Sequence, residues 1–290
     1  MNDRDAPHPY EPWHPLFGCQ LKMRRAYVHI QDLYNAMETF IGSKPYEDVH
    51  DFESQPGQHL VRFKIWERPE PWWSPIIGDI VHNVRSALDH LAWQLVIRNG
   101  RNSKSARSQF PIVILDPFDP SVHRCPEAAK RARVSWKNQT RGMHKADIEL
   151  LKRLQPYNGP DPPNEHPLAR LSQFSNWDKH KEFHFPSQVF MDYHFRATMK
   201  DVRITLLYLK SRGEALEHDE IIARYGVVAT GPNPKLHMNP KGLFDVAFGE
   251  GSPLEGLGIK ETLPTLINHV MEIILGFKDR FDYQDFSPPS

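Results

Sequence analysis

A long helical segment over residues 72–98 is the feature that most constrains the fold of this chain. Ser74 and Pro75 are typical of a helix N-terminus, because serine can cap the first turn and proline lacks an N–H that would need a partner there. Asn99-Gly100 indicates the C-terminus, where a left-handed residue commonly ends a helix. The segment therefore predicts a central helix that buries one apolar stripe, formed by Ile80, Val84, Leu88, Leu91 and Leu95.

The rest of the chain is divided by its 26 prolines. Residues 1–15 contain four of them and are expected to form an extended arm, because proline cannot donate a helical hydrogen bond and restricts the residue before it. Residues 16–184 are expected to form a helical bundle, with a β-hairpin near residues 49–66 where apolar and polar residues alternate. This hairpin is expected either to pair with a sheet formed later in the chain or to cover the bundle. An amphipathic C-terminal helix over residues 259–281 is expected to close the fold by packing back on the bundle.

Residues 185–250 show the two-residue alternation of β-strands. Four segments carry it, namely VFMDYHFRATM, DVRITLLYL, EIIARYGVVAT and GLFDVAF. Turns are expected at Arg212-Gly213 and at Pro232-Asn233. We therefore predict a small antiparallel β-sheet inserted into the helical bundle before the C-terminal helix, which makes the fold class α+β.

Composition and charge exclude several classes of protein. Thirty-six basic and thirty-six acidic residues give a net charge of zero, so the whole chain has no general attraction to nucleic acid or anionic lipid. No apolar run approaches the length of a membrane span, and the N-terminus lacks the apolar core of a signal peptide, so we expect a cytoplasmic protein. Cys19 and Cys125 form neither a disulfide framework nor a paired metal motif. Phosphate-loop and nucleophile-elbow motifs are absent from the sequence, and we expect no cofactor.

The other face of the central helix is unusual in its composition. It carries short polar residues rather than the Lys, Glu and Gln that favour a solvated helix. This composition indicates a partly buried polar seam or a functional site, and Trp93 extends the same face. A solvated face with an Arg85–Asp89 ion pair is the alternative. The residues of this polar face are Asp79, His82, Asn83, Ser86, Asp89 and His90.

Within this helix, Arg85-Ser-Ala-Leu-Asp-His90 has the spacing R-x4-H and resembles the motif of the HEPN superfamily. The resemblance implies a helical protein that cleaves RNA without a metal, from a composite site where two copies meet. It further implies that Arg85 neutralises charge on the phosphate and that His90 transfers a proton. His82, Asn83 and Asp89 would support them. On a straight helix Arg85 and His90 point about 140° apart, which is why a second subunit is attractive.

A second cluster closes the predicted helix that begins at Pro167. Lys179 and His180 stand in its last turn, where the helix dipole favours positive charge. They could instead add phosphate-binding charge to the polar face.

A metal site is another possible use of the histidines. His180 and His184 have H-x3-H spacing but lack the glutamate of metalloprotease helices, and His82 and His90 lie eight residues apart. We therefore expect no metal, although imidazole and carboxylate ligands are available in His82, His90, His180, His184, Asp79 and Asp89.

Residues 101–145 are strongly basic, with ten Lys or Arg against three acidic residues. Aromatic residues interleave with these bases, as in proteins that bind single-stranded RNA. The alternative is that this segment docks on the acidic C-terminal part of the same chain, residues 214–290, which holds twelve acids and six bases. The candidate RNA contacts are Arg131, Arg133, Trp136 and Lys137.

Two functional hypotheses follow. The first is a HEPN-like homodimer that binds or cleaves RNA without a metal, in defence or toxin biology as the resemblance implies. The second is a non-enzymatic helical protein whose polar seam fixes helix packing or dimerisation.

Overall fold

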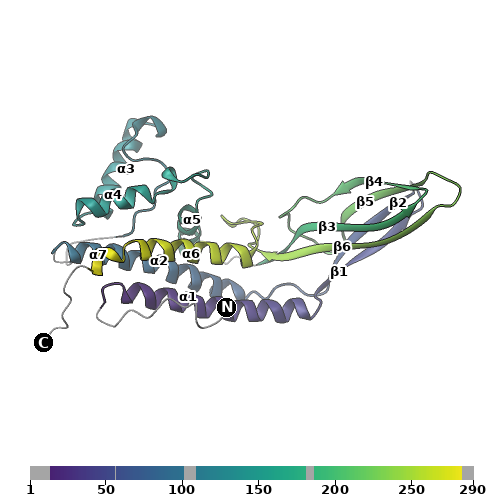
Figure 1. Ribbon diagram of the computed structural model, residues 1–290, viewed down its shortest axis with the longest axis horizontal. Coiled ribbons are helices and arrows are strands. Elements are labelled where there is room, and N and C mark those ends of the chain that lie inside the picture. The colour runs from purple at the N-terminus through teal and green to yellow at the C-terminus, as the bar shows by residue number, and fades with distance from the viewer. Residues whose placement is uncertain (1–13, 56, 101–108, 181–185, 283–290) are drawn as a thin grey trace. The chain divides into compact units, whose positions relative to one another are not determined.

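The computed structural model describes residues 14–55, 57–100, 109–180 and 186–282 (Figure 1). The chain divides into two compact units, each assembled from separate stretches of sequence. Unit 1 comprises residues 1–31, 76–181 and 263–290, and unit 2 comprises residues 32–75 and 182–262. The fold is α+β, with a helical unit, an antiparallel sheet and a C-terminal helix, as the sequence predicts.

Unit 1 is helical and is organised around α2 (Trp73–Arg98). The five residues of the predicted apolar stripe are all at most 1% exposed, so this prediction is confirmed. The first half of α1 (Phe17–Gly42) and most of α6 (Ile259–Gly276) also belong to this unit. The remaining helices of unit 1 are α3 (Pro126–Gln139), α4 (Lys145–Arg153), α5 (Pro167–His180) and α7 (Asp279–Asp282), with short 3-10 turns at Pro120–Val122 and Pro156–Asn158.

Unit 2 is built on a four-stranded antiparallel sheet with the order β1-β2-β5-β4. Its strands are β1 (Tyr46–Glu53), β2 (Gln58–Ile65), β4 (Val202–Leu209) and β5 (Glu220–Ala229). A second, two-stranded ribbon pairs β3 (Ser187–Lys200) with β6 (Lys235–Ala247).

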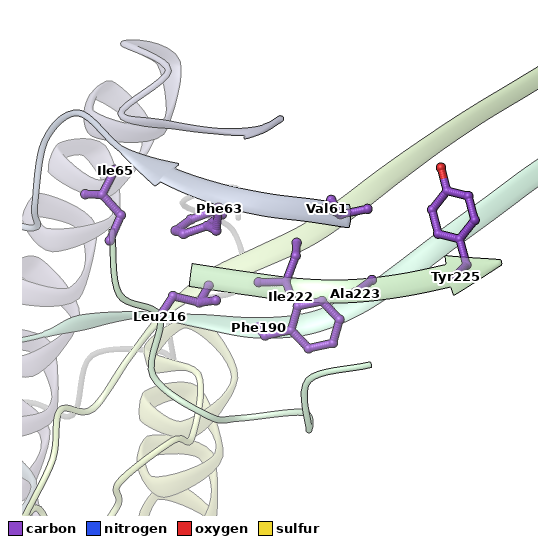
Figure 2. Packing of buried hydrophobic residues seen from close by; sticks show 8 residues of the cluster. All are labelled: Val61, Phe63, Ile65, Phe190, Leu216, Ile222, Ala223 and Tyr225. Carbon is purple, nitrogen blue, oxygen red and sulfur yellow. The ribbon is translucent and has the colours of Figure 1, made fainter. Parts of the chain in front are cut away.

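The core of unit 2 lies between these two layers (Figure 2). Strand β2 contributes Val61, Phe63 and Ile65, which alternate as the period of a strand requires. Phe190 comes from β3 and Leu216 from the segment before β5. The remaining members of the cluster are Ile222, Ala223 and Tyr225 of β5, with Tyr46, Tyr193, Ile204, Val227 and Phe244 packed against it.

The grouping of the strands differs from the prediction of one four-stranded insertion. The four strands within residues 187–247 do not form a single sheet, because β3 pairs with β6 while β4 and β5 pair with each other. The hairpin of β1 and β2 lies in the sheet through the pairing of β2 with β5, which is one of the two positions that the sequence left open for it. Alternation identifies a strand, but the choice of its neighbours depends on contacts between residues far apart in the chain.

The cysteines and the N-terminal arm can also be compared with the sequence. Cys19 is buried, Cys125 is partly buried, and both are free thiols. Most of the expected N-terminal arm, residues 1–13, lies outside the described residues. In the part of the chain that the structure describes, no helix combines the length and the apolar character needed to cross a bilayer.

Candidate functional site

Arg85 and Asp89 of α2 form a clamp around the backbone of Phe110. The Arg85 Nη2 donates to an Asp89 carboxylate oxygen at 3.0 Å and to the Phe110 carbonyl oxygen at 2.7 Å. The same Asp89 oxygen accepts a hydrogen bond from the Phe110 N–H at 3.0 Å. Both backbone polar groups of Phe110, whose side chain is fully buried, are thus satisfied by one ion pair on the helix.

Arg85 is well shielded from solvent in this arrangement. Its side chain is 14% exposed, and burial lowers the pKa of its guanidinium while the nearby Asp89 carboxylate raises it. The Nη1 atom is buried, and no described residue forms a hydrogen bond with it. The Arg85–Asp89 ion pair of the alternative interpretation is present, and a direct contact between Arg85 and an RNA phosphate would require the clamp to open. The phosphate role of Arg85 stays a prediction.

The two histidines of α2 face outward. His82 and His90 are both exposed, and no hydrogen bond or ion pair joins either of them to Arg85 among the residues that the structure describes. The His90 ring lies close to Gly18 of α1, since a Cβ built on Gly18 would be 2.8 Å from His90 Nδ1. Because Gly18 has no side chain, the His90 imidazole can occupy this position against α1.

The polar face of α2 is therefore divided. Asn83 is nearly buried and donates from its side chain to the Asp79 carbonyl oxygen one turn earlier, at 2.8 Å. Asp79 is exposed like the two histidines, and Trp93 is 37% exposed. The expectation of one continuous sequestered seam is wrong within a single chain, because a helix turns only part of its circumference towards its neighbours.

The cluster at the end of α5 gives less information. Lys179 and His180 belong to the last turn of α5, but their side chains lie outside the described residues, as does His184. Their predicted contribution to the polar face thus stays a prediction. In the described ranges, no group of three His, Cys, Asp or Glu side chains is placed to hold a metal ion.

The basic side chains of α3 are accessible. Arg131 and Lys137 are exposed, and Arg133 is partly exposed. Residues 109–145 contain seven Lys or Arg, and among the described residues none of them forms an ion pair with an acidic side chain. The alternative of docking on acidic side chains of the C-terminal part thus has no support from ion pairs in the described segments.

Trp136 does not fit the role of a base-stacking residue. It is 2% exposed and packs edge-on against Phe118, with the ring centroids 6.2 Å apart. This corrects its assignment as an RNA contact, because a ring inside the core cannot stack on a base. Phe118 is 42% exposed, although the Lys152 ammonium lies 4.7 Å from its ring centroid.

Sequence reasoning missed two of the groups that organise unit 1. Phe110 gave a weak signal, since the following Pro111 favours an extended backbone that offers its N–H and C=O to a neighbour. Asp147, in the first turn of α4, is fully buried between Arg98 at 2.9 Å and Arg280 at 3.2 Å. Its partners lie far apart in sequence, so no local pattern could have identified them.

Comparison with known proteins assigns no family. No protein-family model, no curated protein and no solved structure matches this chain.

Proposed function

We propose that unit 1 binds RNA through the basic surface of α3 and cleaves it without a metal, using the histidines of α2. The observation that carries this proposal is the set of exposed or partly exposed basic side chains on α3, none of which pairs with an acidic side chain among the described residues. Such side chains are available to phosphates, and their attraction to RNA does not depend on its sequence.

The exposed histidines supply the chemistry of this proposal. Imidazole changes its charge near neutral pH, so one ring can accept the proton of an attacking 2′-hydroxyl and another can donate to the leaving oxygen. His82 and His90 lie eight residues apart, which is about 12 Å along a helix and too far for both to reach one phosphate. A single chain therefore offers half of an acid–base pair.

Two copies could supply the complete pair. If two α2 helices cross antiparallel about a two-fold axis near Ser86, residue 82 of one copy faces residue 90 of the other. We infer a homodimer in which His82 and His90 meet across the axis. In this proposal Arg85 and Asp89 are positioning residues that hold the helix face and Phe110 in place.

RNA binding is tested by salt dependence with matched variants. The double variant Arg131→Gln and Lys137→Gln is compared with Arg24→Gln and Arg25→Gln, which removes the same charge from exposed positions on α1. The affinity of the first variant for a fluorescent single-stranded RNA should fall, and its salt slope should decrease by about 0.7 for each phosphate that the protein no longer neutralises. Equal slopes for both variants would contradict binding through α3.

Cleavage is tested separately in the presence of EDTA. His90→Ala should lower the cleavage rate about 10²- to 10⁴-fold, the usual contribution of a general acid or base, with RNA affinity unchanged. Mixing His82→Ala with His90→Ala chains should restore part of the activity, because one composite site in a mixed dimer keeps both rings. If the wild type does not cut RNA under these conditions, the cleavage proposal fails while the binding proposal is judged on the salt data.

A purely structural role for the polar face is the second candidate, and the clamp on Phe110 favours it. Arg85→Met, Asp89→Leu and the double variant form a thermodynamic cycle. A structural pair should give a coupling free energy of about 1–2 kcal/mol in unfolding experiments. If RNA is neither bound nor cut while this coupling is present, the packing role is the better description of the face.

A further inference from the structure

Strand β4 forms an edge of the four-stranded sheet and is unusually apolar. It pairs with β5 along one side, and no strand pairs with its other side in the described part of the chain (Figure 1). Four consecutive residues near its end are exposed by 38–58%: Leu206, Leu207, Tyr208 and Leu209. Because successive side chains of a strand point to opposite faces, β4 is apolar and accessible on both faces as well as along its edge.

The opposite edge of the same sheet is different. Strand β1 carries Glu47, Asp48, Asp51 and Glu53, and three of these acids form ion pairs or hydrogen bonds with neighbouring strands. Charged side chains on an edge strand are a usual protection against pairing with another chain. Strand β4 has one charged residue, Arg203, near its beginning.

A bulge is the other common protection of an edge strand. In β4 a bulge occurs only near the end, where the register shifts between Leu206 and Tyr208. The preceding residues Val202–Leu206 pair with β5 without interruption, so the bulge does not protect them. These five residues form a regular edge with unpaired backbone groups, followed by the exposed leucines. Such an edge is a template for a further strand.

We propose that β4 pairs antiparallel with β4 of a second copy of this chain, so that two four-stranded sheets join into one continuous sheet. A two-fold axis makes such strands antiparallel, and each then meets a partner with the same apolar side chains. Arg203 is the second residue of β4. With a two-fold axis near the middle of the strand, the Arg203 side chains of the two copies lie near opposite ends of the pair, so these like charges are kept apart. Because the apolar side chains of one β4 match those of another, we take the partner of β4 to be β4 of a second copy.

Pairing of β4 with the acidic edge β1 of another copy would have a different result. The growing assembly would keep a free β1 edge at one end and a free β4 edge at the other, so further copies could be added without limit. Self-pairing of β4 instead leaves no free β4 edge after two chains, so any larger assembly has to come from the separate α2 contact proposed above. One pair of eight-residue strands covers less than the ~800 Å² per partner of a standard interface, so we expect a reversible dimer that dissociates on dilution.

Sedimentation velocity over a range of protein concentrations tests the proposal. Leu207→Lys should weaken self-association at least tenfold, because it places a charge in the exposed apolar segment directly after the regular edge. Leu21→Lys is the matched control, since Leu21 lies on α1 and both leucines are 50% exposed. A wild type that stays monomeric at 100 µM, or equal effects of both variants, would overturn the proposal.

Cysteine scanning identifies the contact itself. Single cysteines at Arg203, Thr205 and Leu207 are introduced with Cys125→Ser, while Cys19 is buried and burial raises the pKa of its thiol to about 12. Oxidation should cross-link two chains with a yield that peaks at the position nearest the two-fold axis. Absence of cross-linking along the whole strand, or the same yield at all three positions, would overturn self-pairing. Because this readout is confined to β4, it is independent of RNA binding by α3 and of any contact between α2 helices.

Discussion

The two units of this chain stabilise their interiors with different chemistry. Unit 1 places charged groups inside, where Asp147 is held by two arginines and the Arg85–Asp89 pair holds Phe110. Unit 2 also buries a charged group, Lys210 paired with Glu220, but its core gathers several aromatic rings, and the ring centroids of Phe63 and Phe244 lie 4.4 Å apart. Buried ion pairs are directional and tie particular segments together, whereas aromatic packing depends mainly on area and shape.

The two units therefore depend to different degrees on specific side-chain partners. In unit 1 the charged groups connect helices with one another, through Asp147, and with the irregular segment at Phe110, so losing one partner leaves another buried and unsatisfied. In unit 2 the ladder of backbone hydrogen bonds already connects the strands, and the side chains fill the space between the layers. Substitutions in the two units can separate the contribution of charged partners in unit 1 from that of aromatic packing in unit 2.

Phe63→Ala should cause the greatest loss of stability, about 3–5 kcal/mol in the free energy of unfolding, because a fully buried ring leaves a cavity among other rings. Denaturant titration measures the loss. Hydrogen exchange should accelerate in β2 and β5 but not in α3 to α5, if the two units are energetically separate. Phe52→Ala is the control, since Phe52 lies on the same hairpin and is 62% exposed. Equal losses for both variants would contradict the described core.

Asp147→Ala should lower the free energy of unfolding by about 3 kcal/mol, because Arg98 and Arg280 lose the carboxylate that compensates them. Glu149→Ala on the same helix is the comparison. Its side chain is 61% exposed beside Lys152, so a loss below about 1 kcal/mol is expected. A cost for Asp147→Ala no larger than that of Glu149→Ala would remove the contrast between the units.

His166 and His269 extend the contrast to pH. Their ring centroids lie 4.9 Å apart. Burial lowers the pKa of both imidazoles, so each ring stays neutral to a lower pH than it would in water. The unfolded chain, with a histidine pKa of about 6.5, therefore binds more protons than the folded one in the window just below that value. Stability from this pair is fully present above about pH 7 and is lost as the pH falls towards the folded pKa values.

The measurement is the free energy of unfolding between pH 7.5 and 5. His269→Leu should flatten the decrease at low pH, whereas substitution of the exposed His194 by Gln should leave it unchanged. An unaltered pH profile in His269→Leu would show that the pair does not control this window.

Gly18→Ala should have the smallest effect on stability, below about 1 kcal/mol, since alanine has the higher helix propensity but its methyl group would displace His90. The readout is the NMR signal of the His90 ring, which should shift. Gly42→Ala is the control, because nothing lies within 4 Å of a Cβ at that position. An unchanged His90 signal in Gly18→Ala would contradict the contact between α1 and α2.

The sequence predicted the elements better than their assembly. The apolar stripe of α2 and the strand alternation of β2 follow from local periodicity, and both are confirmed. The sequence left open whether the hairpin joins the sheet, because the pairing of β2 with β5 connects segments more than 150 residues apart. For the candidate site, the outward direction of His90 and the burial of Trp136 depend on which neighbours cover each helix face.

Three properties of this chain can be read from local sequence: where it is helical, where it is extended, and which helix carries the unusual polar residues. Each of these properties depends on a residue and its near neighbours. Only the tertiary structure decided that Arg85 holds Phe110, that Asp147 joins two arginines and that β4 ends the sheet. Each of these contacts depends on groups that meet only after distant segments have packed, and burial alone then decides which polar group needs a partner.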